Sequence, residues 1–191
     1  QGAKVIHPRA VEIAMKSNVT LVIKNTLSDC KGTVINSNAI RNTENIITGI
    51  TSMDKRVQVT VELDENKENE NYDILLDELA QNLISIDLIN VFPKQKIFTI
   101  DGKNIDSFKI IMEELGLIYS YVEECSKIAI IGSRMRGLPG VMAKILRVLT
   151  KANIEVLQTA DSHTTIWCLV ESKNSEKAIN ALHNEFKLGS E

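Results

Sequence analysis

The hydrophobic pattern of the last two-thirds of the chain occurs twice. A leucine-rich run at helical spacing, followed by a short apolar strand-like run, occupies residues 75–86 and returns at residues 145–156, an offset of 70 residues. The same offset sets Phe98 opposite Cys168. A repeat of this length, in which helical and strand patterns alternate, predicts two copies of one small α/β unit.

The first copy contains six predicted elements. Residues 57–63 alternate apolar and polar side chains, which is the period of a strand, and the leucines of residues 75–83 follow at helical spacing. Gly116 supplies a stop for a second amphipathic helix. That helix is expected at residues 108–115, and the remaining strands are expected at residues 86–92, 96–101 and 117–123. The order βαββαβ is the split βαβ pattern of a ferredoxin-like sandwich.

The second copy ends one strand short. It reads as a strand at residues 127–131, a helix from Pro139, strands at residues 154–160 and 164–171, and a last helix through Leu182. A long uncovered sheet edge is unfavourable, so another segment should occupy the missing position. Residues 46–51, a strand-like run with no partner of its own, are the best candidate. The first copy is then inserted within the second.

The opening segment follows neither copy. A helix is expected to begin at Pro8, which suits a first helical turn, and to end by Asn18. Residues 19–24 read as a strand, residues 25–32 as a turn-rich connector and residues 33–35 as a short extended piece. This segment is therefore interpreted as the edge of a different domain.

Composition narrows the function classes. The net charge of -3 offers no basic face for nucleic acid, and we expect neither a membrane span nor a signal peptide because no apolar run approaches ~20 residues. The three cysteines, Cys30, Cys125 and Cys168, contain no Cys-x-x-Cys pair, which argues against structural zinc or a redox motif. Cys168 alternates with apolar neighbours and should be buried. A reduced, cytoplasmic protein fits best.

The residues of the loop at positions 132–140 fit two interpretations. Its glycines and the following helix start would favour a carboxylate or another anion, but a plain tight turn explains the same residues and is the stronger reading from spacing alone. Asp161 and Ser162 lie in the turn between two predicted strands, next to His163. Consecutive residues in a hairpin cannot face one another as a catalytic triad does, so turn formation is the better interpretation there.

Several of these stretches resemble the regulatory region of the aspartokinases, which phosphorylate aspartate at the head of lysine, threonine and methionine synthesis. Residues 2–12 (GAKVIHPRAVE) resemble the end of that family's amino-acid kinase domain, and residues 25–33 resemble its exit toward the regulatory part. Residues 134–141 (RMRGLPGV) and 158–167 (QTADSHTTIW) resemble its second ACT domain. The similarity covers essentially the whole chain and is greatest to the diaminopimelate-sensitive type known in Gram-positive bacteria.

The resemblance implies an α+β fold of two ferredoxin-like βαββαβ ACT domains, the first inserted in the second, after a short remnant of the kinase domain. The implied ranges are residues 1–44 for the remnant and linker, 55–125 for the first ACT domain, and 45–54 plus 126–191 for the second. The kinase motifs, with their ATP and Mg, lie upstream in the family. We therefore expect no catalytic residue, cofactor or metal site in this chain.

The resemblance also implies partners and an effector site. The partners are a kinase domain of the same protein, a second copy of the chain paired through the ACT domains, and an amino-acid effector: lysine, threonine or meso-diaminopimelate. Asp87 matches an aspartate that contacts the effector in lysine-sensitive relatives. The full set of effector-binding residues expected on this basis is Asp87, Asn90, Val91, Met135, Arg136, Gly137, Asp161 and Ser162.

Two other functions remain open at this point. A freestanding ACT-type regulator would use the same binding unit without a kinase, and one linked to transcription would need a DNA-binding element that the sequence does not offer. An RNA-binding ferredoxin-like domain would need aromatic side chains on its central strands and a basic face. The strand-like runs at residues 57–63 and 127–131 offer neither.

Overall fold

The computed structural model describes residues 5–36, 47–62, 70–132 and 139–189. The chain divides into two compact units, residues 1–45 and residues 46–191. The first unit contains a helix, α1 (Pro8–Lys16), and an antiparallel pair of short strands, β1 (Leu21–Ile23) and β2 (Thr33–Ile35). The His7 ring caps α1, because its Nδ1 accepts the N–H of Arg9 at 3.3 Å. The helix ends at Lys16, and Asn18 follows with a φ of 50°.

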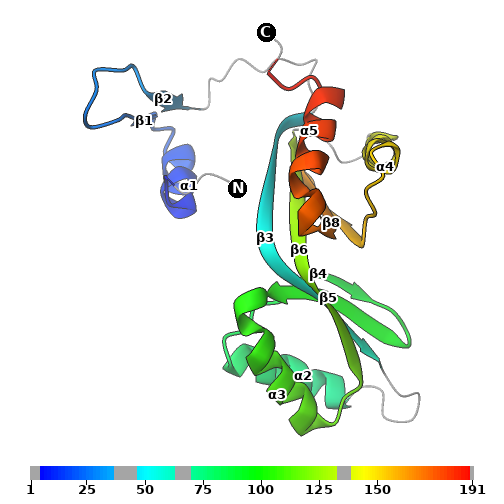
Figure 1. The fold of residues 1–191 in the computed structure, drawn as a ribbon. Helices are drawn as coiled ribbons and strands as arrows, with labels where there is room; N and C mark the ends of the chain where they lie inside the picture. Colours follow the sequence, from blue (N-terminus) through cyan, green and yellow to red (C-terminus); the bar gives the residue numbers. More distant parts are fainter. Residues whose placement is uncertain (1–4, 37–46, 63–69, 133–138, 190–191) are drawn as a thin grey trace. The chain divides into compact units, whose positions relative to one another are not determined.

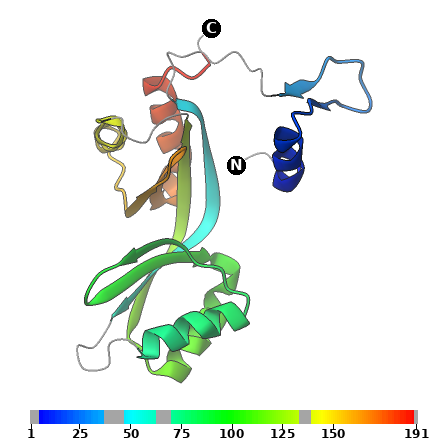
Figure 2. The ribbon, with the colours of Figure 1, turned by 180° about the vertical axis from the view of Figure 1, so that it is seen from behind.

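The second unit is built on one antiparallel sheet of six strands in the order β4-β5-β3-β6-β8-β7. Figures 1 and 2 show its two long central strands, β3 and β6, with a helix pair at each end. The elements in chain order are β3 (Ile47–Glu62), α2 (Glu70–Gln81), β4 (Asp87–Val91), β5 (Gln95–Asp101), η1 (Gly102–Asn104), α3 (Ile105–Leu115), β6 (Tyr119–Gly132), α4 (Val141–Lys151), β7 (Gln158–Asp161), β8 (Thr165–Glu171), η2 (Ser172–Asn174) and α5 (Ser175–Glu185).

Both central strands run through the two sequence repeats. The strands predicted at residues 117–123 and 127–131 are one strand, β6, and the run at residues 47–51 is the first part of β3. Lys55 and Glu124 have φ values of 57° and 52°, and the β3–β6 register shifts on either side of Arg56. A left-handed residue bends a strand without ending it, which is why the alternation in the sequence appeared to stop there.

The predicted insertion is confirmed by strand pairing. The first part of β3 pairs with the second part of β6, so that Ile50 lies opposite Ile130 and Thr51 opposite Ala129. The later part of β3 pairs with β5 and with the first part of β6. Residues ahead of the first repeat therefore supply the strand that the second repeat lacks. The α+β class and the two ferredoxin-like units are confirmed with it.

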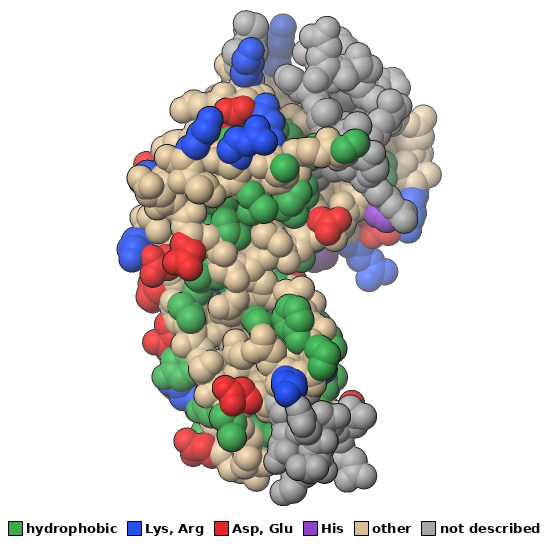
Figure 3. Space-filling model, turned by 90° about the vertical axis from the view of Figure 1, so that its right-hand side faces the viewer, with side chains coloured by type: hydrophobic (Ala, Val, Ile, Leu, Met, Phe, Trp, Pro, Cys, Tyr) green, Lys and Arg blue, Asp and Glu red, His purple; other side chains and the backbone are tan. Residues whose placement is uncertain are grey.

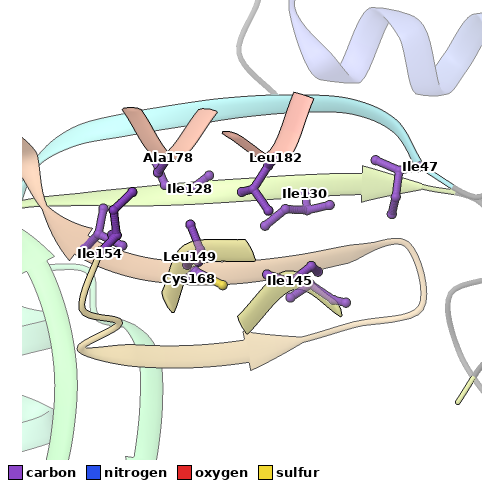
Figure 4. Packing of buried hydrophobic residues seen from close by; sticks show 11 residues of the cluster. Ile47, Ile128, Ile130, Ile145, Leu149, Ile154, Cys168, Ala178 and Leu182 are labelled. Atoms are coloured by element: carbon purple, nitrogen blue, oxygen red, sulfur yellow. The ribbon is translucent and has the colours of Figure 1, made fainter. Parts of the chain in front are cut away.

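Each repeat has its own core under two helices. In the second repeat, Ile47 of β3 packs with apolar side chains of β6, β8, α4 and α5 (Figure 4). In the first, the corresponding core joins β3 and β5 to α2 and α3. Pairs 70 residues apart are buried in both copies: Leu75 and Ile145, Leu79 and Leu149, Ile84 and Ile154, Phe98 and Cys168, Ile100 and Val170. Cys168 is buried as predicted, and desolvation by burial raises the pKa of its thiol to about 12.

Several predicted boundaries were wrong. The strand expected at residues 154–160 begins only at Gln158, because the turn after α4 uses Asn153, with a φ of 52°, and leads extended chain back to the sheet. Leu83 makes the same turn after α2 with a φ of 56°. The helix expected from Pro139 begins at Val141, since Gly140, with a φ of 92°, takes the N-cap position.

A third, smaller cluster joins the two repeats. Leu88 of β4 is buried against Cys125 of β6 and Leu169 of β8, with Leu157 and Trp167 packed at the margin. Leu169 lies between Cys168 and Val170, which belong to the helix-covered core, so it points to the opposite face of the sheet. The first repeat therefore covers part of the helix-free face of the second, and the candidate site lies at this junction.

Candidate functional site

Asp87 opens β4 at the junction between the repeats. Its Oδ1 accepts the N–H of Leu88 at 2.9 Å, and its backbone carbonyl accepts the Thr99 hydroxyl at 3.1 Å. The β4–β5 register is irregular between Asp87 and Asn90, and Leu88 has a φ of 48°. This local irregularity turns Leu88 into the small junction core while the Asp87 side chain remains 46% exposed.

Lys127 of β6 forms an ion pair with Asp87 through its Nζ and the carboxylate Oδ2. The Lys127 side chain is only 10% exposed, and its Nζ lies 5.8 Å from the centre of the Trp167 ring. A buried ammonium requires a partner of opposite charge, and Asp87 supplies it. Sequence analysis missed this lysine, although a lysine inside an otherwise apolar strand was the available signal.

The charge of Asp87 is maintained by its neighbours. Desolvation by burial opposes the ionised form, but the hydrogen bonds from Lys127 and the Leu88 N–H, with the positive charges of Lys127 and Arg56, outweigh it. Together they lower the pKa of Asp87 below its ordinary value of 3.8. The carboxylate is therefore ionised at neutral pH, and it can accept hydrogen bonds from a further cation because its two oxygens offer about four lone-pair sites.

Gln158 of β7 holds β4 from the other repeat. Its side-chain Nε2 donates to the carbonyl of Leu88 and, at 2.6 Å, to Oδ1 of Asn90. Its Oε1 accepts from Nε2 of Gln58 at 3.0 Å, and the same Gln58 nitrogen lies 3.4 Å from the Leu157 carbonyl. Of the predicted residues, Asp87 is bound by Lys127 and Asn90 by Gln158. The sequence analysis singled out neither Lys127 nor Gln158.

A pocket of about 440 Å³ opens beside Asp87. Its charged walls also include Arg56, Asp101 and Lys103, while Met53, Leu83 and Ile86 form its apolar part. Asp101 Oδ2 lies 3.7 Å from Arg56 Nη2 and 4.0 Å from Lys103 Nζ. A pocket that mixes both signs of charge with apolar surface is suited to a small zwitterion that carries an aliphatic side chain.

Comparison with known proteins shows which proteins this chain resembles. The sequence profile of the ACT domain matches residues 120–184. Aspartokinase 1 of Bacillus subtilis (strain 168) is 36% identical to this chain over 193 residues, which are 98% of this chain and 48% of that protein. Over nearly its whole length the chain is thus similar to part of an aspartokinase, and residues 120–184 match the ACT domain. The chain spans about half the length of the curated relatives that it matches.

Two solved structures share the fold of this chain. The ligand-free regulatory subunit of aspartate kinase from Thermus thermophilus aligns with a TM-score of 0.66 at 19% identity, over 74% of this chain and 99% of that one. E. coli aspartokinase III, crystallised with lysine and aspartate, aligns with a TM-score of 0.76 at 19% identity, over 96% of this chain and 42% of that one. Both support the α+β ACT architecture derived above.

None of the other predicted effector residues that the structure describes lines the Asp87 pocket, and Asn90 is bound to Gln158 instead. Val91, the last residue of β4, is 65% exposed and does not line it. Ser162 stabilises the β7–β8 turn, since its Oγ accepts the N–H of Thr165 at 3.2 Å, and the neighbouring Asp161 is exposed. Met135, Arg136 and Gly137 lie outside the described residues. The roles expected for all of these residues stay predictions.

Metal binding has no support in the described parts of the chain. Within those residues, no group of three or more His, Cys, Asp or Glu side chains is placed to hold a metal ion. The charged side chains that line the pocket at the junction are suited to bind a charged organic ligand by hydrogen bonds and ion pairs. Asp87, Arg56 and Lys103 are the side chains placed to provide these contacts.

Proposed function

We propose that this chain is the regulatory part of an aspartokinase of the diaminopimelate-sensitive type. In this proposal it binds an end-product amino acid, namely lysine, threonine or meso-diaminopimelate, and transmits feedback inhibition to aspartate phosphorylation in lysine, threonine and methionine biosynthesis. The observation that carries the proposal is the ionised Asp87 carboxylate in a pocket of an ACT-domain chain. The ligand's ammonium binds there, beside Lys127, through charge-assisted hydrogen bonds.

The exposed apolar surface of the first unit favours a chain attached to a kinase domain over a freestanding regulator. Its apolar side chains are widely exposed, with Leu27 at 94% and Met15 at 71%. A short helix and a strand pair of this kind cannot bury a core of their own, so the rest of a kinase domain is the natural cover. ATP and Mg belong to that domain, and the chain alone is expected not to phosphorylate aspartate.

We further propose that the chain forms a homodimer through its ACT repeats. Figure 3 shows hydrophobic side chains reaching the surface at several places on one face of the molecule. On the edge strand β4 and just beyond it, Ile89, Val91 and Phe92 are exposed. A second copy would cover such an edge. Sedimentation at high micromolar concentration checks this, and a single monomeric species would contradict it.

The proposed compartment is the cytoplasm, where the pathway's amino acids are made. No helix among the described residues is long and apolar enough to cross a membrane.

A thermal-shift titration tests the effector. The chain is heated with lysine, threonine, methionine or meso-diaminopimelate, each from micromolar to millimolar concentration. A ligand at one hundred times its dissociation constant stabilises the folded state by about 2.7 kcal/mol, which raises the melting temperature by several degrees. Methionine, the only one of the four not proposed as effector, serves as the matched control. An unchanged melting temperature with all four would contradict the proposed function.

A further inference from the structure

Arg56 has a largely buried side chain with few hydrogen-bond acceptors around it. Its side chain is 16% exposed, and its Nε is fully buried with no hydrogen-bond partner among the described residues. Its Nη2 contacts the Met53 sulfur at 2.8 Å, a weak acceptor, and lies 3.7 Å from Asp101, beyond hydrogen-bond distance. Because buried polar groups are normally satisfied, this guanidinium is suited to an additional anion.

The backbone holds Arg56 at the pocket wall. It lies directly after Lys55, the left-handed residue of β3, and the β3–β6 register shifts on both sides of it. On the facing turn, Gly102 approaches β3 so closely that a Cβ there would lie 3.0 Å from the Lys55 carbonyl oxygen. This close approach sets Lys103 against the same pocket, where it adds a second positive charge.

The charge balance of the pocket also favours an anion. The three cations Arg56, Lys103 and Lys127 face the two carboxylates of Asp87 and Asp101, which leaves one positive charge in excess. Lys127 is already paired with Asp87, so the excess lies with Arg56 and Lys103. A guanidinium presents parallel N–H donors that match a carboxylate better than an ammonium does.

We infer that Arg56 binds the α-carboxylate of the effector amino acid, with Lys103 as a supporting charge, while Asp87 holds the α-ammonium. The inference rests on the proposed function and adds the orientation of the ligand. With its two charged ends fixed, the ligand's side chain lies toward Met53, Leu83 and Ile86. The pocket therefore takes an α-amino acid with an aliphatic chain and excludes the corresponding amines without the carboxylate.

Calorimetry with acids and their methyl esters tests the inference. Each of lysine, threonine and meso-diaminopimelate that binds the wild-type chain is compared with its methyl ester, which lacks the carboxylate charge. The ester is expected to bind tenfold to a hundredfold more weakly, the equivalent of one charge-assisted hydrogen bond. An ester that binds as tightly as the acid would overturn the inference without the use of any variant.

Variants then assign the carboxylate to Arg56. Arg56→Gln should lose tenfold to a hundredfold in affinity for the acid and little for the ester. Arg56→Lys keeps the positive charge but lacks the parallel N–H donors of the guanidinium, so its affinity for the acid should lie between those of wild type and Arg56→Gln. The exposed Arg147 on α4 provides the control, since Arg147→Gln should bind like wild type. If Arg56→Gln still distinguishes acid from ester, or weakens both equally, Arg56 does not hold the carboxylate. If no amino acid binds the wild-type chain, the proposed function itself fails.

Discussion

Gln158 and Leu88 occupy the same position in the two repeats, 70 residues apart, and contact each other through the Gln158 side-chain N–H and the Leu88 carbonyl. The edge strands β7 and β4 are thus joined by a side chain instead of a ladder of backbone hydrogen bonds. The symmetry is broken one residue earlier, where Asp87 corresponds to Leu157. Because leucine cannot bind an ammonium, the second repeat cannot repeat the ammonium site that we propose for the first.

Replacing Gln158 by Leu should loosen the junction. The substitution leaves the Leu88 carbonyl, the Asn90 side chain and Gln58 without their partner in a buried position, at a cost of about 1–3 kcal/mol in the free energy of unfolding. Urea denaturation measures this loss. Gln95→Leu on β5 is the control, because Gln95 is exposed and such changes usually stay within about 0.5 kcal/mol. Equal stability of the two variants would show that Gln158 does not hold the repeats together.

Asp87→Asn should impair both ligand binding and folding. The ligand's ammonium loses a charge-assisted partner worth roughly 1.5–3 kcal/mol, a tenfold to hundredfold loss in affinity. The variant also leaves the buried Lys127 ammonium without its counter-charge, so its melting temperature should fall.

The double variant Asp87→Asn with Lys127→Met separates the two effects. Removing the unpaired ammonium should restore much of the melting temperature, while effector affinity stays low because the carboxylate is still missing. Calorimetry and thermal denaturation of the same samples check this. Full effector affinity in the double variant would show that Asp87 does not bind the ammonium.

Acid should weaken the junction through Asp87. Its folded pKa is lowered, so the ion pair with Lys127 contributes stability at pH values above 3.8, and that contribution is lost as the pH falls below 3.8 through the folded value. Unfolding free energies measured between pH 6 and pH 2.5 should show a steeper loss below pH 4 for wild type than for Asp87→Asn. Parallel curves would mean that Asp87 does not contribute to the acid dependence.

The sequence predicted the repeats well because each contains its own periodic pattern. Buried pairs such as Leu79 and Leu149 recur at the same offset, and the missing strand followed from counting elements. The junction was harder to predict, because Lys127, Gln158 and Arg56 acquire their roles from contacts with other strands. The hydrophobic periodicity of a strand predicts which face of the sheet a side chain occupies, but not which residues of other strands it contacts. The sequence indicated these three residues only as long polar side chains within largely apolar strands.

The insertion also has a consequence for local stability. Ile47 packs in the core of the second repeat, although Ile128, the next buried residue of that core, lies 81 positions later in the chain (Figure 4). Deleting residues 1–56 removes the β3 segment that pairs with residues 127–132 and leaves Val57–Glu62 for the first repeat. Protection should therefore be lost first in the second repeat.

Hydrogen exchange measures this directly. In the 1–56 deletion, amides of residues 127–131 and 165–171 should exchange much faster than in the full chain, while those of residues 96–100 change less. The matched control deletes residues 1–45, which removes the first unit and keeps β3 whole. It should leave both sets of amides protected, because the second repeat then retains its fourth strand. Full protection of residues 127–131 in the longer deletion would mean that the second repeat is stable without the β3 segment, contrary to the insertion.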